Sequence, residues 1–322
     1  MLKKAIFRRI ALTGTALFVF AIIYFFPSTD KTNNDFIQEL VYNKETPKIS
    51  IYLLDYNNYV AKSYIAFNSQ NIESNITEII ETLTMNGKKG DYIPNGFKAL
   101  IPEDTKLLNQ SLDNKGLLKI DFSKEFLKIK SMDEEKMIEA IIYSLTEIKE
   151  VKKIMIFVEG KQLTELPHSK KYLPRVLDRN FGINKIYDLD KLKDSTKTTV
   201  YYVSKYNSNY YYVPVTFVNN NSDNKIEIII NELKSSQLYQ TNLMSYLATN
   251  AELLTYEVKE NKVYMSFNKY LLDDFKNKSI LEEVKYTIAL SIKDNLDATD
   301  VIFNVDNEEI STITLENVDK KQ

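Results

Sequence analysis

An internal duplication constrains this chain more than any other feature of its sequence. The segment 99–126 reads ALIPEDTKLLNQSLDNKGLLKIDFSKEF, and a weaker copy, LATNAELLTYEVKENKVYMSFNKYL, recurs at 247–271. In each segment three apolar residues alternate with polar ones, as in a half-buried strand: Leu118, Ile120 and Phe122 in the first, and Val263, Met265 and Phe267 in the second. Matching features recur about 145 to 152 residues apart. We therefore interpret the chain as two copies of one folding unit.

Both copies predict the same order of elements, ββαββαβ. In the first copy we expect strands at 49–54 and 60–67, a helix at 72–83, a hairpin at 106–122, a helix at 137–148 and a strand at 151–158. In the second copy the counterparts are strands at 200–203 and 210–218, a helix at 226–233, the weaker copy of the hairpin within 247–271 with its alternating strand at 263–267, a helix after Ser279 and a strand at 301–305. The fold class is therefore α+β, with tandem domains at 48–160 and 198–315, each a small mixed sheet with two helices packed on it.

Local signals refine this order. The hairpin turns at Asp113-Asn114-Lys115-Gly116, where glycine can adopt a positive φ. The second helix of each copy follows a serine with a glutamate three residues later, a spacing that predicts a capping box: Ser131 with Glu134, and Ser279 with Glu282.

The N-terminus predicts a membrane anchor. Four cations within 1–9 precede Ile10–Phe26, an uncharged segment that spans about 26 Å at ~1.5 Å per residue. The cations place 1–9 in the cytoplasm and the rest outside, with 27–47 as a polar tether. A cleaved signal peptide is the alternative. We favour the uncleaved single-pass helix because the segment is long and lacks a small-x-small cleavage site.

The connection at 161–197 is too apolar for a flexible linker. Its apolar residues include Leu166, Tyr172, Val176, Leu177, Phe181, Ile183 and Ile186. Because flexible linkers are polar and rich in glycine or serine, we expect this one to pack along both domains and fix their relative orientation.

Composition excludes several classes of function. The net charge is −2 and no basic stripe follows the first nine residues, so we expect no nucleic-acid partner. The chain contains no cysteine, which rules out disulfides, thiolate metal sites and an acylated lipoprotein cysteine.

No constellation of catalytic residues stands out. Ser123 lies in no nucleophile elbow, and His168, the single histidine, is distant in the sequence. Glu103, Asp104 and Asp121 lie on or near the hairpin at 106–122. We interpret them as charged side chains exposed to solvent at the edge of a strand. We therefore predict no enzyme activity and assign no catalytic, cofactor or metal residues.

Tyrosines crowd the hairpin that opens the second copy. The residues that we assign to a partner surface are Tyr201, Tyr206, Tyr210, Tyr211 and Tyr212. On alternating strands about half of these rings would face outward, and exposed tyrosine is favoured at protein interfaces. Equally, tyrosine serves here as an ordinary strand former.

Several motifs resemble the GerM (sporulation and spore germination) domain family. They are the Ile-Pro-x-x-Thr step at 101–105, the strand Gly-Leu-Leu-Lys-Ile-Asp-Phe-Ser at 116–123, the helix at 140–148 leading into the strand at 151–160, and the tail around Arg179 and Ile183-Asn184. In the second copy Ser266-Phe267-Asn268 stands in for Asp-Phe-Ser, so that copy is divergent. The resemblance covers 49–184 well and 198–310 weakly.

This resemblance implies domains similar to ring-building motifs. It implies a non-enzymatic, membrane-tethered factor of endospore formation or germination that acts as an assembly or scaffold protein for an envelope complex between mother cell and forespore. The partners would be other envelope or sporulation-complex proteins, with homo-oligomerisation left open. Typical family members look like lipoproteins, whereas this chain would be held by Ile10–Phe26.

Other functions stay open at this point. The chain could instead be an extracytoplasmic module that binds a small ligand or cell-wall glycan in a cleft between the two copies, unrelated to sporulation. A cell-wall hydrolase would need convergent acid groups, and the sequence does not reveal them.

Overall fold

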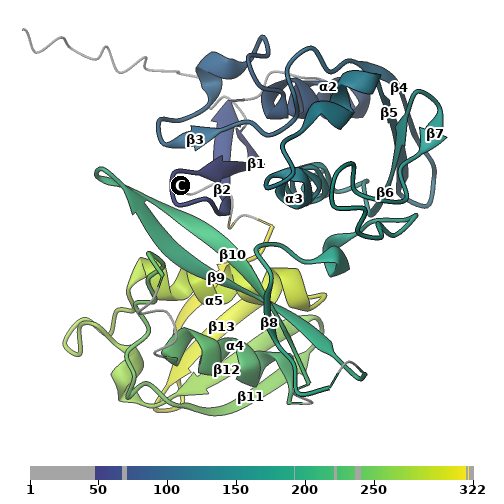
Figure 1. The fold of residues 1–322 in the computed structure, drawn as a ribbon. Coiled ribbons are helices and arrows are strands. Elements are labelled where there is room, and N and C mark those ends of the chain that lie inside the picture. The colour runs from purple at the N-terminus through teal and green to yellow at the C-terminus, as the bar shows by residue number, and fades with distance from the viewer. Residues whose placement is uncertain are drawn as a thin grey trace, which may run out of the picture. The chain divides into compact units, whose positions relative to one another are not determined.

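A computed structural model describes residues 48–66, 71–191, 193–220, 223–235, 241–316 and 318 (Figure 1). The predicted cytoplasmic tail, transmembrane helix and tether at 1–47 lie outside the described residues. No helix in the described part of the chain is long and apolar enough to cross a membrane. The two copies, called repeat 1 and repeat 2 below, belong to one compact unit, Pro47–Gln322.

Repeat 1 contains two helices and two sheets. Its helices are α2 (Ile72–Leu83) and α3 (Glu134–Leu145). One sheet has the order β2-β1-β3 and the other β4-β5-β6-β7. The strands are β1 (Lys48–Asp55), β2 (Val60–Ala66), β3 (Phe97–Lys98), β4 (Leu107–Leu112), β5 (Leu117–Phe122), β6 (Lys153–Val158) and β7 (Lys161–Gln162). Short 3-10 helices lie at Gly90–Tyr92 and Lys124–Lys128.

Repeat 2 likewise has two helices and two sheets, but its three-stranded sheet is ordered differently. Its third strand pairs parallel with the second strand of the hairpin, whereas β3 of repeat 1 pairs antiparallel with the first strand, β1. Its helices are α4 (Lys225–Lys234) and α5 (Glu282–Asn295). Its sheets have the orders β8-β10-β9 and β11-β12-β13-β14. The strands are β8 (Ile186–Asp188), β9 (Thr196–Tyr206), β10 (Asn209–Asn219), β11 (Leu253–Lys259), β12 (Lys262–Phe267), β13 (Asp300–Val305) and β14 (Glu308–Thr314). Two further 3-10 helices lie at Arg179–Phe181, in the connection, and at Lys269–Leu271.

The expected single mixed sheet per repeat is wrong, because each repeat divides its strands between two sheets. The reason lies in the second helix. Ten of the twelve residues of α3 are buried, so this helix cannot cover one sheet with one face and turn the other to water. The backbone N–H of Tyr52 in β1 donates to Ser144 Oγ of α3 at 2.8 Å, while α3 also shares one core with Leu118 and Ile120 of β5. The helix therefore packs against both sheets.

The duplicated hairpins have the predicted form and the same irregularity. In both, the alternating strand pairs antiparallel with its partner arm and parallel with the closing strand, β5 with β6 and β12 with β13. The pairing register shifts between Leu107 and Asn109 in repeat 1 and between Leu253 and Thr255 in repeat 2. Both shifts are β-bulges that leave one leucine unpaired on the edge strand.

The predicted capping boxes do not form. Helix α3 begins at Glu134 without a side-chain cap, and its Glu134 carboxylate instead accepts the backbone N–H groups of His168 and Ser169 at 2.8 and 3.0 Å. Helix α5 likewise lacks a side-chain cap, since Ser279 Oγ donates to Asp273. Backbone N–H groups of the connection therefore occupy the Glu134 carboxylate that a capping box would use.

Gly116 adopts the predicted positive φ, at 81°, and we expect Gly116→Ala to destabilise the unit by about 1–2 kcal/mol. An added Cβ would lie 2.8 Å from the Glu150 carbonyl oxygen, in addition to the backbone strain. Urea unfolding of the 47–322 unit measures the effect. Gly90→Ala is the matched control, because nothing lies within 4 Å of the added Cβ and no positive φ is required. If Gly116→Ala and Gly90→Ala lower the free energy of unfolding equally, the positive φ and close contacts of Gly116 do not explain the loss.

Candidate functional site

The two repeats meet at a buried pair of equivalent tyrosines. The Tyr52 and Tyr201 hydroxyl oxygens lie 2.9 Å apart. Each tyrosine is held by the corresponding serine of its own repeat: the Tyr52 N–H donates to Ser144 Oγ at 2.8 Å, and the Tyr201 N–H donates to Ser291 Oγ at 2.9 Å. Matching residues therefore face each other, as they would across the two-fold axis of a homodimer.

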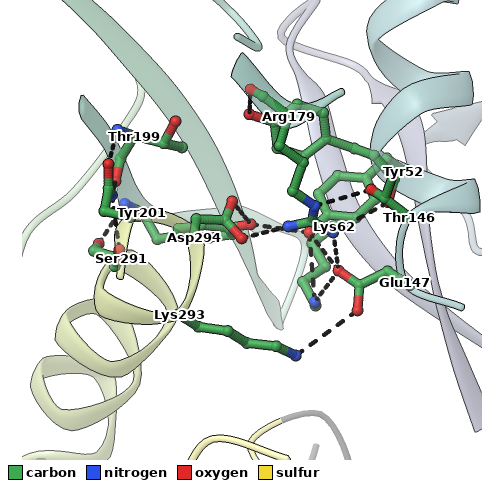
Figure 2. Close-up of polar contacts among 12 residues, drawn as sticks. Tyr52, Lys62, Thr146, Glu147, Arg179, Thr199, Tyr201, Ser291, Lys293 and Asp294 are labelled. Atoms are coloured by element: carbon green, nitrogen blue, oxygen red, sulfur yellow. Dashed lines mark hydrogen bonds and ion pairs between the residues drawn. The ribbon is translucent and has the colours of Figure 1, made fainter. Parts of the chain in front are cut away.

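Arg179, from the connection, lies at the centre of this contact (Figure 2). Its guanidinium Nη2 donates to Glu147 Oε1 at 2.6 Å, and Nη1 donates to Asp294. Its Nε donates to Thr146 Oγ1 at 2.9 Å. Glu147 lies two residues after the end of α3 and Asp294 lies in the last turn of α5, at matching positions of the two copies. A single guanidinium therefore joins the two repeats through the planar fork that suits carboxylates.

We call this group of side chains the inter-repeat joint: Tyr52, Lys62, Glu147, Arg179, Tyr201, Lys293 and Asp294. Two lysines also lie beside Glu147, with Nζ of Lys62 at 3.2 Å and Nζ of Lys293 at 3.8 Å from its carboxylate, so three cations face the two carboxylates of the joint. Burial alone would raise the pKa of Glu147, but the three surrounding cations outweigh burial and hold its pKa well below the usual range. Burial raises the pKa of both tyrosines, which stay neutral hydrogen-bond donors.

Asn184 ties the repeats together a second time. Its side-chain Nδ2 donates to the carbonyl oxygens of Val60 in β2 and Pro214 in β10, at 2.8 and 2.7 Å. Its Oδ1 accepts the Val60 N–H at 2.9 Å. The preceding residue, Ile183, is fully buried and donates its N–H to Thr216 Oγ1 at 2.9 Å. The connection therefore fills the space between β2 and β10.

Lys185 and His168 fix the connection on repeat 1. Nζ of Lys185 lies 2.6 Å from Glu139 and 3.0 Å from Glu135, both on α3. The His168 ring Nε2 lies 2.6 Å from the Ile129 carbonyl oxygen. The single histidine thus has a structural partner on the chain.

Three of the five tyrosines assigned to a partner surface are not available to a partner. Tyr201, Tyr211 and Tyr212 are buried. Tyr201 belongs to the inter-repeat joint, and Tyr211 donates its hydroxyl to Asp55 of repeat 1 at 2.8 Å. The expected alternation fails because β9 and β10 are covered on both faces, by α4 and α5 on one and by repeat 1 on the other.

The other two tyrosines lie near the hairpin tip. Tyr206 is half-buried against the ring of Tyr56, with ring centroids 5.0 Å apart, and against Gly96. Tyr210 is 51% exposed, with Nζ of Lys205 5.0 Å from its ring. Only Tyr210 among the five therefore presents most of its ring to solvent.

The residues weighed for catalysis lie in separate hydrogen-bonded settings. Ser123 Oγ accepts the Lys106 N–H at 3.0 Å, and the Asp121 carboxylate accepts the Gly160 N–H at 3.0 and 3.1 Å. Within the described residues, no group of three or more histidine, aspartate or glutamate side chains is placed to hold a metal ion. The chemistry of the inter-repeat joint is ion pairing between two folded halves.

Sequence reasoning identified Arg179 and Asn184 only as part of a family-like tail. It missed Glu147, Asp294 and Lys62 altogether. A signal was present, because Glu147 and Asp294 are acidic residues at matching positions of the two copies, next to helix faces that are otherwise apolar.

We expect the joint to make stability depend on pH in the acid range. The folded-state pKa of Glu147 lies below its unfolded value of 4.5, so its contribution is complete above that pH and is lost as the pH falls toward the folded-state pKa. Between about pH 4 and pH 3 the free energy of unfolding of the parent 47–322 unit should fall by about 1 kcal/mol per pH unit more than that of its Glu147→Gln variant. Urea unfolding at each pH measures both. If the free energies of unfolding of the parent and of Glu147→Gln fall equally over this pH range, the expectation is contradicted.

Comparison with known proteins identifies two family regions. The model of the Germane family, described as "Sporulation and spore germination", matches residues 50–164 and 199–311. The spore germination protein GerM of Bacillus subtilis (strain 168) is 29% identical over 265 residues, which are 80% of this chain and 71% of that protein. The tandem GerMN domains of the sporulation protein GerM from Bacillus subtilis match with a TM-score of 0.74 and 29% identity, over 82% of this chain and 92% of that one. With both repeats matched and the tandem arrangement shared, this chain belongs to the Germane family of sporulation and spore germination proteins.

Proposed function

We propose that the chain is a non-enzymatic scaffold protein of endospore formation or germination, anchored in the cell membrane by Ile10–Phe26 with its repeats outside the cytoplasm. In this role it acts in an envelope complex between mother cell and forespore. The observation that carries the proposal is the tandem family match, whose relative is named as a spore germination protein.

The inter-repeat joint supports a scaffold role. A scaffold must hold its binding surfaces at a fixed separation. The inter-repeat joint ties the repeats through Arg179, and Asn184 ties them a second time. Its buried charges are paired with one another within the chain. The joint thus serves orientation of the repeats, which is what assembly through domain surfaces needs.

Deletion of the gene in the native organism tests the sporulation role. We expect a loss of heat-resistant spores that the full chain restores. A chain lacking 10–26 should fail to restore them and should leave the membrane fraction. A normal count of heat-resistant spores after deletion, or unchanged fractionation without 10–26, would contradict the proposal.

Crosslinking in sporulating cells tests the assembly role. We expect the full chain to co-purify with defined envelope proteins at the time of engulfment, and the Arg179→Ala chain to do so less efficiently because its repeats are held together less firmly. Arg175→Ala is the matched control. Recovery of the crosslinked chain without any envelope partner would count against a scaffold.

A further inference from the structure

Two large apolar side chains protrude into solvent beside the start of α3. Met132, in the segment between β5 and α3, and Tyr172, in the connection, are each 75% exposed. Among the described residues they are the most exposed large hydrophobic side chains, and Leu127 in the same segment as Met132 is also exposed. Single exposed apolar residues are ordinary on protein surfaces, whereas a group of them lying together marks an interaction surface.

The connection brings Met132 and Tyr172 to the same part of the surface. The Glu134 carboxylate, two residues after Met132, accepts two backbone N–H groups of the connection at 2.8 and 3.0 Å. Nζ of Lys171, the residue before Tyr172, lies 3.2 Å from the Glu135 carboxylate. The two segments are therefore bonded to each other directly beside both apolar side chains.

Lysines surround these apolar side chains. Among the exposed side chains at 124–133 and 159–172, six are cations and two are carboxylates: Lys124, Lys128, Lys130, Lys161, Lys170 and Lys171 against Glu159 and Glu165. The chain as a whole carries a net charge of only −2. Because the two segments are far apart in the sequence, this local excess of cations arises only when the fold brings them together.

Half of these lysines are paired and half are not. The pairs are Lys128 with Glu125 at 4.0 Å, Lys170 with Glu165 at 3.2 Å and Lys171 with Glu135 at 3.2 Å. Lys124, Lys130 and Lys161 form no ion pair within the part of the chain that the structure describes. The half-buried carboxylate of Asp133 lies near the half-buried ammonium group of Lys136. Exposed cations are therefore in excess, and this surface complements an anionic partner.

The combination of charge and exposed apolar surface fits a lipid bilayer. Met132 and Tyr172 protrude with three quarters of their surface in solvent, so they offer no pocket for the side chains of a rigid partner. A fluid lipid surface needs no pocket, because apolar side chains enter its headgroup region while lysines contact anionic headgroups. Tyrosine is itself enriched at membrane–water interfaces. A soluble polyanion would match the lysines but leave the apolar side chains in water.

We propose that repeat 1 rests on an anionic lipid bilayer through the exposed side chains of 124–133 and 168–172, called the membrane face below. Leu127, Met132 and Tyr172 insert between headgroups, and the lysines contact the lipid phosphates. The proposal rests on the proposed function only for the nearness of a membrane. Residues 27–47 can hold the unit no farther than about 75 Å from the bilayer, at ~3.5 Å per residue. Such tethering raises the effective concentration and lets a weak contact persist.

Vesicle binding by the purified 47–322 unit, which lacks the proposed anchor, tests the membrane face. Flotation compares vesicles of mixed phosphatidylglycerol and phosphatidylcholine with vesicles of phosphatidylcholine alone. We expect the unit to bind the phosphatidylglycerol vesicles about tenfold more tightly and to be released by high salt. Hydrogen exchange of the bound unit should slow at 127–133 and 168–172. Equal binding to both vesicles, no binding to either, or slowing only elsewhere would overturn the proposal.

Two double variants separate the charges from the apolar side chains. One combines Lys124→Gln with Lys130→Gln, and the other combines Met132→Ser with Tyr172→Ser. Each should weaken binding to the phosphatidylglycerol vesicles by about tenfold and leave urea unfolding unchanged, because all four side chains are exposed. Phe275→Ser is the matched control, since this ring is 58% exposed in the corresponding segment of repeat 2, and it should change nothing. Full binding by the Met132→Ser, Tyr172→Ser variant would indicate a site for soluble anions, such as free phosphate or an acidic protein, and would overturn the proposal.

The proposed anchor and the membrane face are tested separately. A high-salt wash releases a contact made by lysines, whereas a membrane-spanning helix stays in the bilayer. Fractionation of cells after such a wash therefore tests Ile10–Phe26 alone, and the vesicle experiment tests the membrane face alone. A negative vesicle result leaves the spore count in the deletion strain as an independent result.

Discussion

Replacing Arg179 with alanine should destabilise the 47–322 unit by about 3–5 kcal/mol, because it leaves buried carboxylates without their common partner. Glu147 and Asp294 are only 6% and 4% exposed, and Arg179 is the group that bonds to both. Urea unfolding followed by tyrosine fluorescence measures the loss. We also expect the single transition to split in two, since the two core clusters follow the two repeats, apart from Ala61 of repeat 1, which belongs to the repeat-2 cluster.

Two further variants distinguish the geometry of the guanidinium from its charge. Arg179→Lys should show an intermediate loss, because an ammonium group cannot bond two carboxylates with the fixed fork of arginine. Arg175→Ala, on the exposed part of the same connection, should stay within about 0.5 kcal/mol of the parent. If Arg179→Ala and Arg175→Ala unfold at the same urea concentration, the joint does not hold the repeats together.

Phe122→Ala and Phe267→Ala should each cost about 3–5 kcal/mol, by loss of buried surface and creation of a cavity. Both rings are fully buried at matching positions of the two cores, and Phe122 stacks on Phe126 with centroids 4.5 Å apart. Because the inter-repeat joint couples the halves, either substitution should lower the stability of the whole unit. Urea unfolding read by circular dichroism and by fluorescence should give coincident transitions.

Double variants that combine each phenylalanine substitution with Arg179→Ala test whether the joint couples the two repeats. Once the joint is broken, Phe122→Ala should shift only the transition of repeat 1 and Phe267→Ala only that of repeat 2. Hydrogen exchange assigns each transition to its repeat. If each single phenylalanine variant already unfolds one repeat alone while Arg179 is present, the coupling through the joint is contradicted.

Much of the fold follows from periodicity. The alternating triplet in β5 and β12 and the apolar stripes of α2 and α4 specify these elements locally, and each lies where the pattern predicts. The division into two sheets could not be predicted from periodicity. The sequence of α3 shows one apolar stripe, which suggests contact with one sheet, whereas packing buries Ser144 and Glu139 as well. From the sequence alone, a polar residue that is buried with a hydrogen-bond partner in the core is predicted to be exposed.

The site was harder to predict for a related physical reason. Glu147 and Asp294 look like solvated charges until the two repeats are brought together, and only then do they share Arg179. The tyrosines of β9 and β10 were misread because alternation predicts exposure only for a sheet with one free face. Long-range pairing between repeats is not encoded in any local window of the sequence.

The single arginine at the centre of the joint suggests an advantage of joining the two units in one polypeptide. In a true homodimer every residue appears twice, so two guanidinium groups would compete for the place between the two opposed carboxylates that Arg179 alone occupies. A covalent tandem escapes that requirement, since each half can change independently. The fusion therefore permits one cation to serve two opposed carboxylates, an asymmetric solution that identical subunits cannot adopt.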